Sequence, residues 1–130
     1  MKLACVIHRF GPQMTGGSEA HCLAIATQLA ARAHDIEVLT SCATNYVTWA
    51  NALPPGESRE DALRVRRFPV TRPRHLNRFR EISEWVFTER ATAAEQETWF
   101  RENGPDMPAL LDHLRAHGRD YDRVLFWSYR

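Results

Sequence analysis

The sequence has no long hydrophobic segment and almost no lysine. Its first apolar run, Leu3–Ile7, is short, and nothing in the chain approaches the ~18 apolar residues that a membrane span requires. The same run is too short for the apolar region of a signal peptide. Lys2 is the only lysine, so arginine carries nearly all of the positive charge. These features predict a cytoplasmic protein, with peripheral contact at the inner membrane face as an open alternative.

Cysteine is scarce as well. The three cysteines, Cys5, Cys22 and Cys42, are odd in number and lack C-x-x-C spacing. This usage is typical of reduced thiols in the cytosol and indicates neither a disulfide framework nor a metal site. The six histidines include one H-x-x-x-H pair, His113 and His117, and no H-E-x-x-H pattern. One pair on a helix face is fewer ligands than the three or four of a protein metal site. We therefore expect no metal and no bound cofactor.

The formal net charge is only +1, so no global field attracts nucleic acid. One local feature stands out, an arginine cluster with His75 among its members: Arg64, Arg66, Arg67, Arg72, Arg74, Arg78 and Arg80. A solvated strand edge, partly balanced by nearby acidic residues, is the favoured interpretation of this cluster. Contact with an anionic membrane surface or a lipid-linked acceptor is the second. Nucleic acid is disfavoured, because no aromatic residues alternate with the arginines to stack on bases.

Short apolar segments alternate with helix-like segments along the chain. The expected strands are 3–7, 35–40, 63–70 and 122–128, and the expected helices are 18–33, two within 76–100, and one from 106 or 107 to 117. The first strand is a continuous apolar run of the kind buried on both faces of a parallel sheet. Together with the next helix and strand it forms a βαβ unit. The pattern predicts an α/β, Rossmann-like domain with a parallel sheet in the order 3-2-1-4.

Two further expectations concern the segments between and within these elements. Residues 41–61 are predicted to be a long irregular loop, because prolines and a glycine at positions 54–56 break any helix. The aromatic-rich helices within 76–100 are predicted to be anchored in the core by Trp85, Val86, Phe87, Trp99 and Phe100.

The last predicted strand has no helix after it, so we expect residues 1–130 to be an incomplete domain. Its apolar residues Val124, Leu125, Phe126 and Trp127 would then be poorly shielded. Unpaired strand edges and exposed apolar patches promote association. We therefore expect the chain to self-associate through this edge or end, or to be poorly soluble.

The loop between the first strand and first helix contains Gly11, Gly16 and Gly17. A glycine pair at the start of a helix lets the backbone approach a ligand, and the free amides there attract anions. A P-loop is excluded, because Gly17 occupies the position of its lysine, and the G-x-G-x-x-G dinucleotide pattern is absent. The remaining choices are an anion site formed by the glycine pair, or a tight turn with Ser18 as the helix cap.

A series of motifs in chain order resembles the opening of bacterial group 1, family 4 glycosyltransferases. The first is Val6-Ile-His-Arg-Phe-Gly-Pro12 followed by Gly16-Gly-Ser-Glu19. The others are Leu39-Thr-Ser-Cys-Ala43, Tyr46-Val-Thr-Trp49-x-Asn51-x-Leu-Pro-Pro-Gly56, Val65-Arg-Arg-Phe-Pro69, Asn103-Gly-Pro105 and Pro108-Ala-Leu-Leu111. The resemblance covers nearly the whole chain.

The resemblance implies a two-domain GT-B fold and a retaining hexosyltransferase that uses a nucleotide-diphosphate sugar as donor and a glycan, a lipid-linked molecule or a small molecule as acceptor. Residues 1–130 would be part of the N-terminal, acceptor-side domain, without the donor-binding domain and without catalytic residues. Gly16 and Gly17 would lie near the donor phosphates. The residues expected to line the cleft or meet the acceptor are Arg9, Ser18, Glu19, Ser41, Asn45 and Trp49.

Two other functions remain open. One is a stand-alone Rossmann-like module that binds a phosphorylated small molecule without catalysis. The other is an interaction protein that uses the arginine cluster and an exposed sheet edge.

Overall fold

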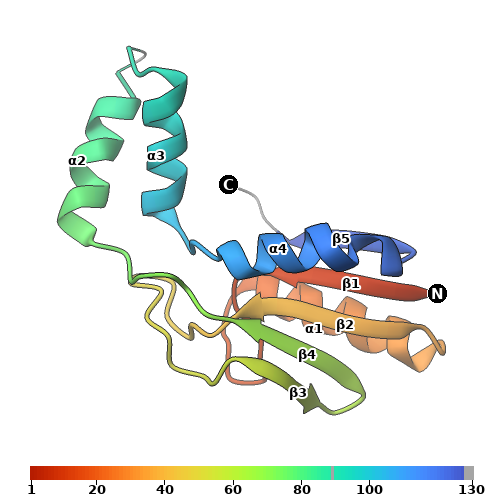
Figure 1. Ribbon diagram of the computed structural model, residues 1–130. Coiled ribbons are helices and arrows are strands. Elements are labelled where there is room, and N and C mark those ends of the chain that lie inside the picture. The colour runs from red at the N-terminus through yellow and green to blue at the C-terminus, as the bar shows by residue number, and fades with distance from the viewer. Residues whose placement is uncertain (89, 128–130) are drawn as a thin grey trace.

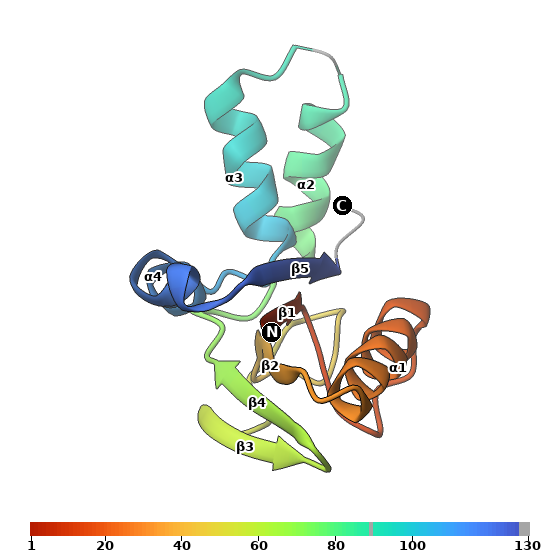
Figure 2. The same ribbon diagram turned by 90° about the vertical axis from the view of Figure 1, so that its right-hand side faces the viewer.

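The computed structural model describes residues 1–88 and 90–127. Within them the strands form one sheet in the order β3-β4-β2-β1-β5, with α1 on one face and α4 on the other (Figures 1 and 2). The predicted α/β fold is confirmed. The elements in chain order are β1 (Lys2–Ile7), α1 (Gly17–Ala31), β2 (Asp35–Ser41), β3 (Gly56–Glu60), β4 (Leu63–Phe68), α2 (Leu76–Val86), α3 (Ala93–Asn103), α4 (Pro108–His117), the short 3-10 helix η1 (Gly118–Asp120) and β5 (Arg123–Trp127).

The prediction of a purely parallel sheet in the order 3-2-1-4 is wrong, because an additional strand, β3, lies in the segment expected to be a loop. β1, β2, β4 and β5 are parallel, but β3 pairs antiparallel with β4 at the sheet edge. The side chains of β3 are mostly exposed, so the strand lacks the apolar alternation by which strands are recognised. A tight turn at Asp61, with φ 52°, and an ion pair between Glu57 and Arg66 across the two strands stabilise the hairpin instead.

Apolar cores lie on both faces of the sheet, and β1 contributes to each. Its residues Leu3, Cys5 and Ile7 pack on the α1 side, whereas Ala4 and Val6 pack in the core that includes α4. Successive strand residues point to opposite faces, so this double burial follows from the continuous apolar run. It fixes the carboxyl end of β1, from which the glycine loop leaves, between two packed layers.

The α2 and α3 helices form an antiparallel hairpin that projects beyond the carboxyl edge of the sheet (Figure 1). The expectation of two helices here is confirmed, and a capping box between Thr92 and Glu95 starts α3. The expectation that these helices are anchored in the core is wrong. The exposed fractions of Trp85, Phe87 and Phe100 are 46%, 73% and 58%, and Val86 and Trp99 are only half-buried. Because the hairpin stands away from the sheet, its side chains are shielded only where the two helices meet.

β5 forms the other sheet edge, beside β1. The strand predicted over 122–128 matches it, although Ser128 lies outside the described residues. Val124, Leu125 and Trp127 are half-buried, and Phe126 is 66% exposed. None of the helices in the described ranges combines the length and apolar composition that crossing a membrane demands.

Candidate functional site

A cavity of about 360 Å³ opens at the carboxyl end of β1. We call it the edge cavity. β1 pairs with β2 on one side and with β5 on the other, and the connecting helices α1 and α4 lie on opposite faces of the sheet. Open α/β sheets bind ligands at such topological switch points. The edge cavity is lined by Ile7, His8, Arg9, Thr15, Gly16, Gly17, Ser18, Glu19, Tyr46, Trp49, Asn103, Gly104 and Trp127.

The first turn of α1 brings unpaired backbone amides to this cavity. Gly16 is the N-cap and makes no side-chain capping bond, so the alternative that Ser18 caps the helix is wrong. The amide of Ala20 donates to the carbonyl of Gly16 over 3.0 Å. Among the described residues, no acceptor is found for the amides of Gly17, Ser18 and Glu19. Free amides at the positive end of a helix dipole attract anions.

The structure requires a glycine at position 16 of the turn but not at position 17. A Cβ on Gly16 would lie 2.9 Å from the carboxylate carbon of Glu19, so any larger residue there displaces Glu19. A Cβ on Gly17 would meet nothing within 4 Å, and Gly17 is not in the left-handed region. Alanine at this helical position is favoured over glycine by about 0.5–1 kcal/mol. Neither steric crowding nor backbone conformation therefore requires a glycine at position 17. Because Gly17 has no side chain, the amides of this turn remain accessible from the cavity.

Arg9 and Glu19 line the cavity but are paired with each other. The Arg9 Nε donates to Glu19 Oε1 over 2.9 Å, and Nη2 makes a second, shorter bond to the same oxygen. The side chains are only 10% and 13% exposed. Arg9 also donates to the carbonyls of Thr15 and Thr44. The arginine thus fixes the glycine loop to the loop after β2 and neutralises the carboxylate of Glu19.

Trp49 forms part of the cavity wall in a strained conformation. Its φ is 57°, a region in which a bulky side chain is an outlier and which costs roughly 1–3 kcal/mol. The indole is 6% exposed, and its Nε1 donates to the carbonyl of Asn103 over 2.8 Å. The ring lies edge-on to His8, with centroids 5.5 Å apart. Trp49 is therefore held against the cavity from two sides.

The base of α3 closes the cavity because Gly104 allows a close approach. A Cβ on Gly104 would lie 2.9 Å from Trp49 Cδ1, and its φ is +67°. Arg74 Nε donates to the carbonyl of Asn103 over 2.8 Å, the same carbonyl that Trp49 uses. Glu102, at 2% exposure, pairs with Arg72 and Arg78. The hairpin is thus fixed to the cavity wall through its last residues.

The other predicted acceptor residues lie outside the lining. Ser41 is fully buried, and its hydroxyl donates to the carbonyl of His8 and accepts from the amide of Ala43. Asn45 is exposed, and its side-chain oxygen accepts from the amide of Val47. Neither is among the residues of the cavity.

Three aromatic residues of the lining were not predicted as site residues. His8 directly follows β1, Tyr46 lies in the loop after β2, and Trp127 ends β5. The indole N–H of Trp127 donates to His21 over 3.0 Å. Each lies at the carboxyl end of a strand or just after it, and this shared position is the signal that would have identified them.

The arginine cluster is largely neutralised by the chain itself. Arg64 pairs with Asp35, Arg66 with Glu37 and Glu57, and Arg67 with Glu60. Arg72 and Arg78 share Glu102, and Arg74 binds backbone carbonyls. Of the seven, only Arg80 lacks a partner among the described residues. The cluster therefore holds loops and strands together and does not present a continuous cationic surface.

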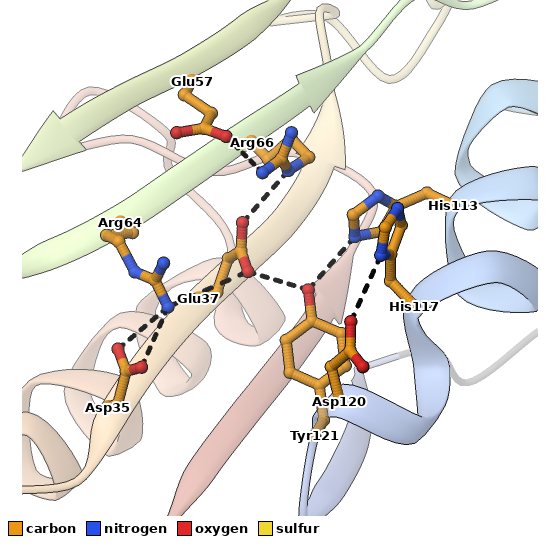
Figure 3. Close-up of polar contacts among 9 residues, drawn as sticks. All are labelled: Asp35, Glu37, Glu57, Arg64, Arg66, His113, His117, Asp120 and Tyr121. Carbon is orange, nitrogen blue, oxygen red and sulfur yellow. Dashed lines mark hydrogen bonds and ion pairs between the residues drawn. The ribbon is translucent and has the colours of Figure 1, made fainter.

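A second polar network lies under α4, away from the edge cavity (Figure 3). Glu37, only 3% exposed, accepts from Tyr121 over 2.7 Å and from Arg66 over 3.0 Å. Burial raises the pKa of Glu37, but these hydrogen bonds and the charges of Arg66 and Arg64 outweigh it, so its pKa lies below its ordinary value. Burial and the carboxylate of Glu37 raise the pKa of Tyr121. The neutral Tyr121 hydroxyl thus donates to Glu37.

His113 continues this network from α4. Its Nε2 lies 3.1 Å from the Tyr121 hydroxyl; since that hydroxyl donates to Glu37, the imidazole donates to it. Burial, the charge of Arg66 and the neighbouring His117 lower the pKa of His113. The network joins α4 and the start of β5 to β2, and so sets where β5 enters the sheet.

In the part of the chain that the structure describes, no group of three or more His, Cys, Asp or Glu side chains is placed to hold a metal ion. Comparison with models of known families, with curated proteins and with solved structures found no match to this chain.

Proposed function

We propose that this chain is the acceptor-side part of a retaining glycosyltransferase and that its edge cavity receives the diphosphate of a nucleotide sugar. The single observation that carries the proposal is the free amides of Gly17, Ser18 and Glu19 at the wall of the edge cavity. A helix N-terminus at a switch point suits a diphosphate, because the ligand accepts hydrogen bonds and meets the positive end of the helix dipole.

The open space around Gly17 supports the same proposal. A bound phosphate needs the backbone within hydrogen-bonding distance, and a side chain at this position would occupy that space. The aromatic lining from His8, Tyr46, Trp49 and Trp127 adds apolar surface of the kind that a sugar ring or a base can contact. The electrostatic role assigned to these amides is stabilisation of the departing diphosphate.

Simple binding of a phosphorylated small molecule is the second candidate, because the free amides serve it equally well. The two differ in what they require of the ligand. A binding module is satisfied by the phosphate alone, whereas a transferase site also prefers the nucleotide-sugar form. An interaction protein that uses the arginine cluster is not proposed, since the chain itself pairs nearly all of those arginines.

The test is NMR titration of the chain with inorganic pyrophosphate and with UDP- and GDP-hexoses. We expect the amide resonances of Gly17, Ser18 and Glu19 to shift, with tighter binding of one nucleotide sugar than of pyrophosphate. Gly17→Ala should weaken that binding by about tenfold or more, because a hydrogen bond to a charged group contributes about 1.5–3 kcal/mol. We expect no sugar transfer by the chain alone.

Gly118→Ala is the matched control. A Cβ on Gly118 also meets nothing within 4 Å, but Gly118 lies after α4 and outside the cavity lining. Binding should be unchanged in this variant, and both variants should fold at least as stably as the parent chain. Equal binding by Gly17→Ala and the parent would refute the proposed ligand position. Preference for pyrophosphate over every nucleotide sugar would favour the binding module, and transfer by the chain alone would place catalytic groups within it.

A further inference from the structure

The α2–α3 hairpin carries aromatic side chains that the described residues of the chain leave exposed. Neither helix packs closely on the sheet, and α2 packs mainly against α3. Both helices leave the body of the molecule together, as the two views show (Figures 1 and 2). No residue of α2 is buried, and in α3 only Glu102 and Asn103 are. A two-helix hairpin without a third layer cannot bury the apolar sides of both helices.

The exposed aromatic residues gather around Trp99. Its ring centroid lies 5.9 Å from that of Phe79, 5.8 Å from that of Phe87 and 5.1 Å from that of Phe100. Phe87 and Phe100 are 73% and 58% exposed, so two members of one continuous cluster face solvent. We call Phe79, Phe87, Trp99 and Phe100 the aromatic face. Contiguous exposed apolar patches mark interaction surfaces.

The charges of the hairpin indicate which kind of partner the aromatic face suits. Arg72 and Arg78 are committed to Glu102, and Arg101 is paired with Glu97. Among the described residues of the hairpin, the charges left without a partner include both signs: Arg80, Arg90, Glu81 and Glu84. A surface that carries both positive and negative charges is not attracted to an anionic bilayer, which binds clusters of positive charge. It can pair with itself about a twofold axis, where each arginine meets an acid of the other copy.

We infer that the aromatic face docks on the aromatic face of a second copy of this chain. The two hairpins then form a four-helix arrangement with the Trp99 clusters at its centre, which gives each helix the neighbour it lacks. This inference does not depend on the proposed function. It moves the self-association surface away from β5, where Val124, Leu125 and Trp127 are already half-buried and Trp127 is hydrogen-bonded to His21.

The test is sedimentation equilibrium of the full chain up to about 100 μM. We expect a dimer, and the double variant Phe87→Ser, Phe100→Ser should raise its dissociation constant by about tenfold or more. The control is Phe126→Ser on β5, which removes a phenyl ring that is 66% exposed and should leave the dimer intact. Far-UV circular dichroism of both variants checks that the helices remain.

Three outcomes would overturn the inference. The first is a monomer across the whole concentration range. The second is a dimer that Phe126→Ser dissociates and the double variant does not, which would assign association to the β5 edge. The third is a monomeric chain that sediments with phosphatidylcholine–phosphatidylglycerol vesicles, with loss of vesicle binding in the double variant. That result would assign the aromatic face to a membrane.

Discussion

Replacement of Glu37 by glutamine tests how α4 and β5 are fixed to the sheet. Glutamine keeps the size of the side chain but removes the charge that Tyr121 and Arg66 contact at 2.7 and 3.0 Å. Removal of one partner from a buried ion pair destabilises by about 3–5 kcal/mol. Arg66 is 29% exposed and also pairs with Glu57, so its charge is partly compensated. We therefore expect a loss of roughly 2–3 kcal/mol in the free energy of unfolding.

The same substitution should change how stability depends on pH. The folded pKa of Glu37 lies below its ordinary value of 4.5, so its contribution is complete above about pH 4.5 and is lost as the pH falls through the folded pKa. His113 has a folded pKa below its ordinary value of 6.5. The unfolded chain takes up that proton first, so stability also declines as the pH falls below about 6.5. A fall in pH therefore destabilises the fold through both Glu37 and His113.

The assay is urea unfolding of the parent chain and Glu37→Gln at several pH values between about 7 and 3.5. The parent should lose stability in two stages, and the variant should lack the part of the lower stage that Glu37 contributes. Glu102, whose pKa also lies below its ordinary value because of Arg72, should keep its own part. Tyr121→Phe is the companion variant, because it removes one hydrogen bond to Glu37 but leaves the charge, and should cost about 1–2 kcal/mol. The reasoning is refuted if Glu37→Gln changes stability at pH 7 by less than about 0.5 kcal/mol, or if both proteins have the same acid profile.

Two further substitutions test the wall of the edge cavity. Arg9→Met should destabilise by about 3–5 kcal/mol in urea unfolding, because it leaves the Glu19 carboxylate, 13% exposed, without its partner; a loss below about 1 kcal/mol would contradict the assigned role of Arg9. Gly104→Ala should destabilise by about 1–3 kcal/mol, since its φ of +67° and the close contact with Trp49 both oppose a side chain. Gly118→Ala, which meets no atom within 4 Å, is the control, and a similar loss in both glycine variants would refute the steric argument.

Local patterns determined much of the fold. The run Leu3–Ile7 is apolar throughout, so only burial on both faces satisfies it, and the following helix and strand then require a βαβ unit. β3 was missed because its stability comes from a backbone ladder and a cross-strand ion pair and not from apolar alternation. The burial of Phe87 and Phe100 was mispredicted for the opposite reason. Aromatic residues at helical spacing predict a core, but the helices that carry them do not reach the sheet.

By itself the sequence determined where the proposed anion site would lie, because two glycines after a buried strand place a helix start at the carboxyl edge. Only the tertiary structure decided which residues surround it. Arg9 and Glu19 neutralise each other there, Ser41 is used by the backbone, and Asn103 and Trp127 arrive from distant parts of the chain. Such partners depend on the packing of elements far apart in sequence, and no local pattern encodes that packing.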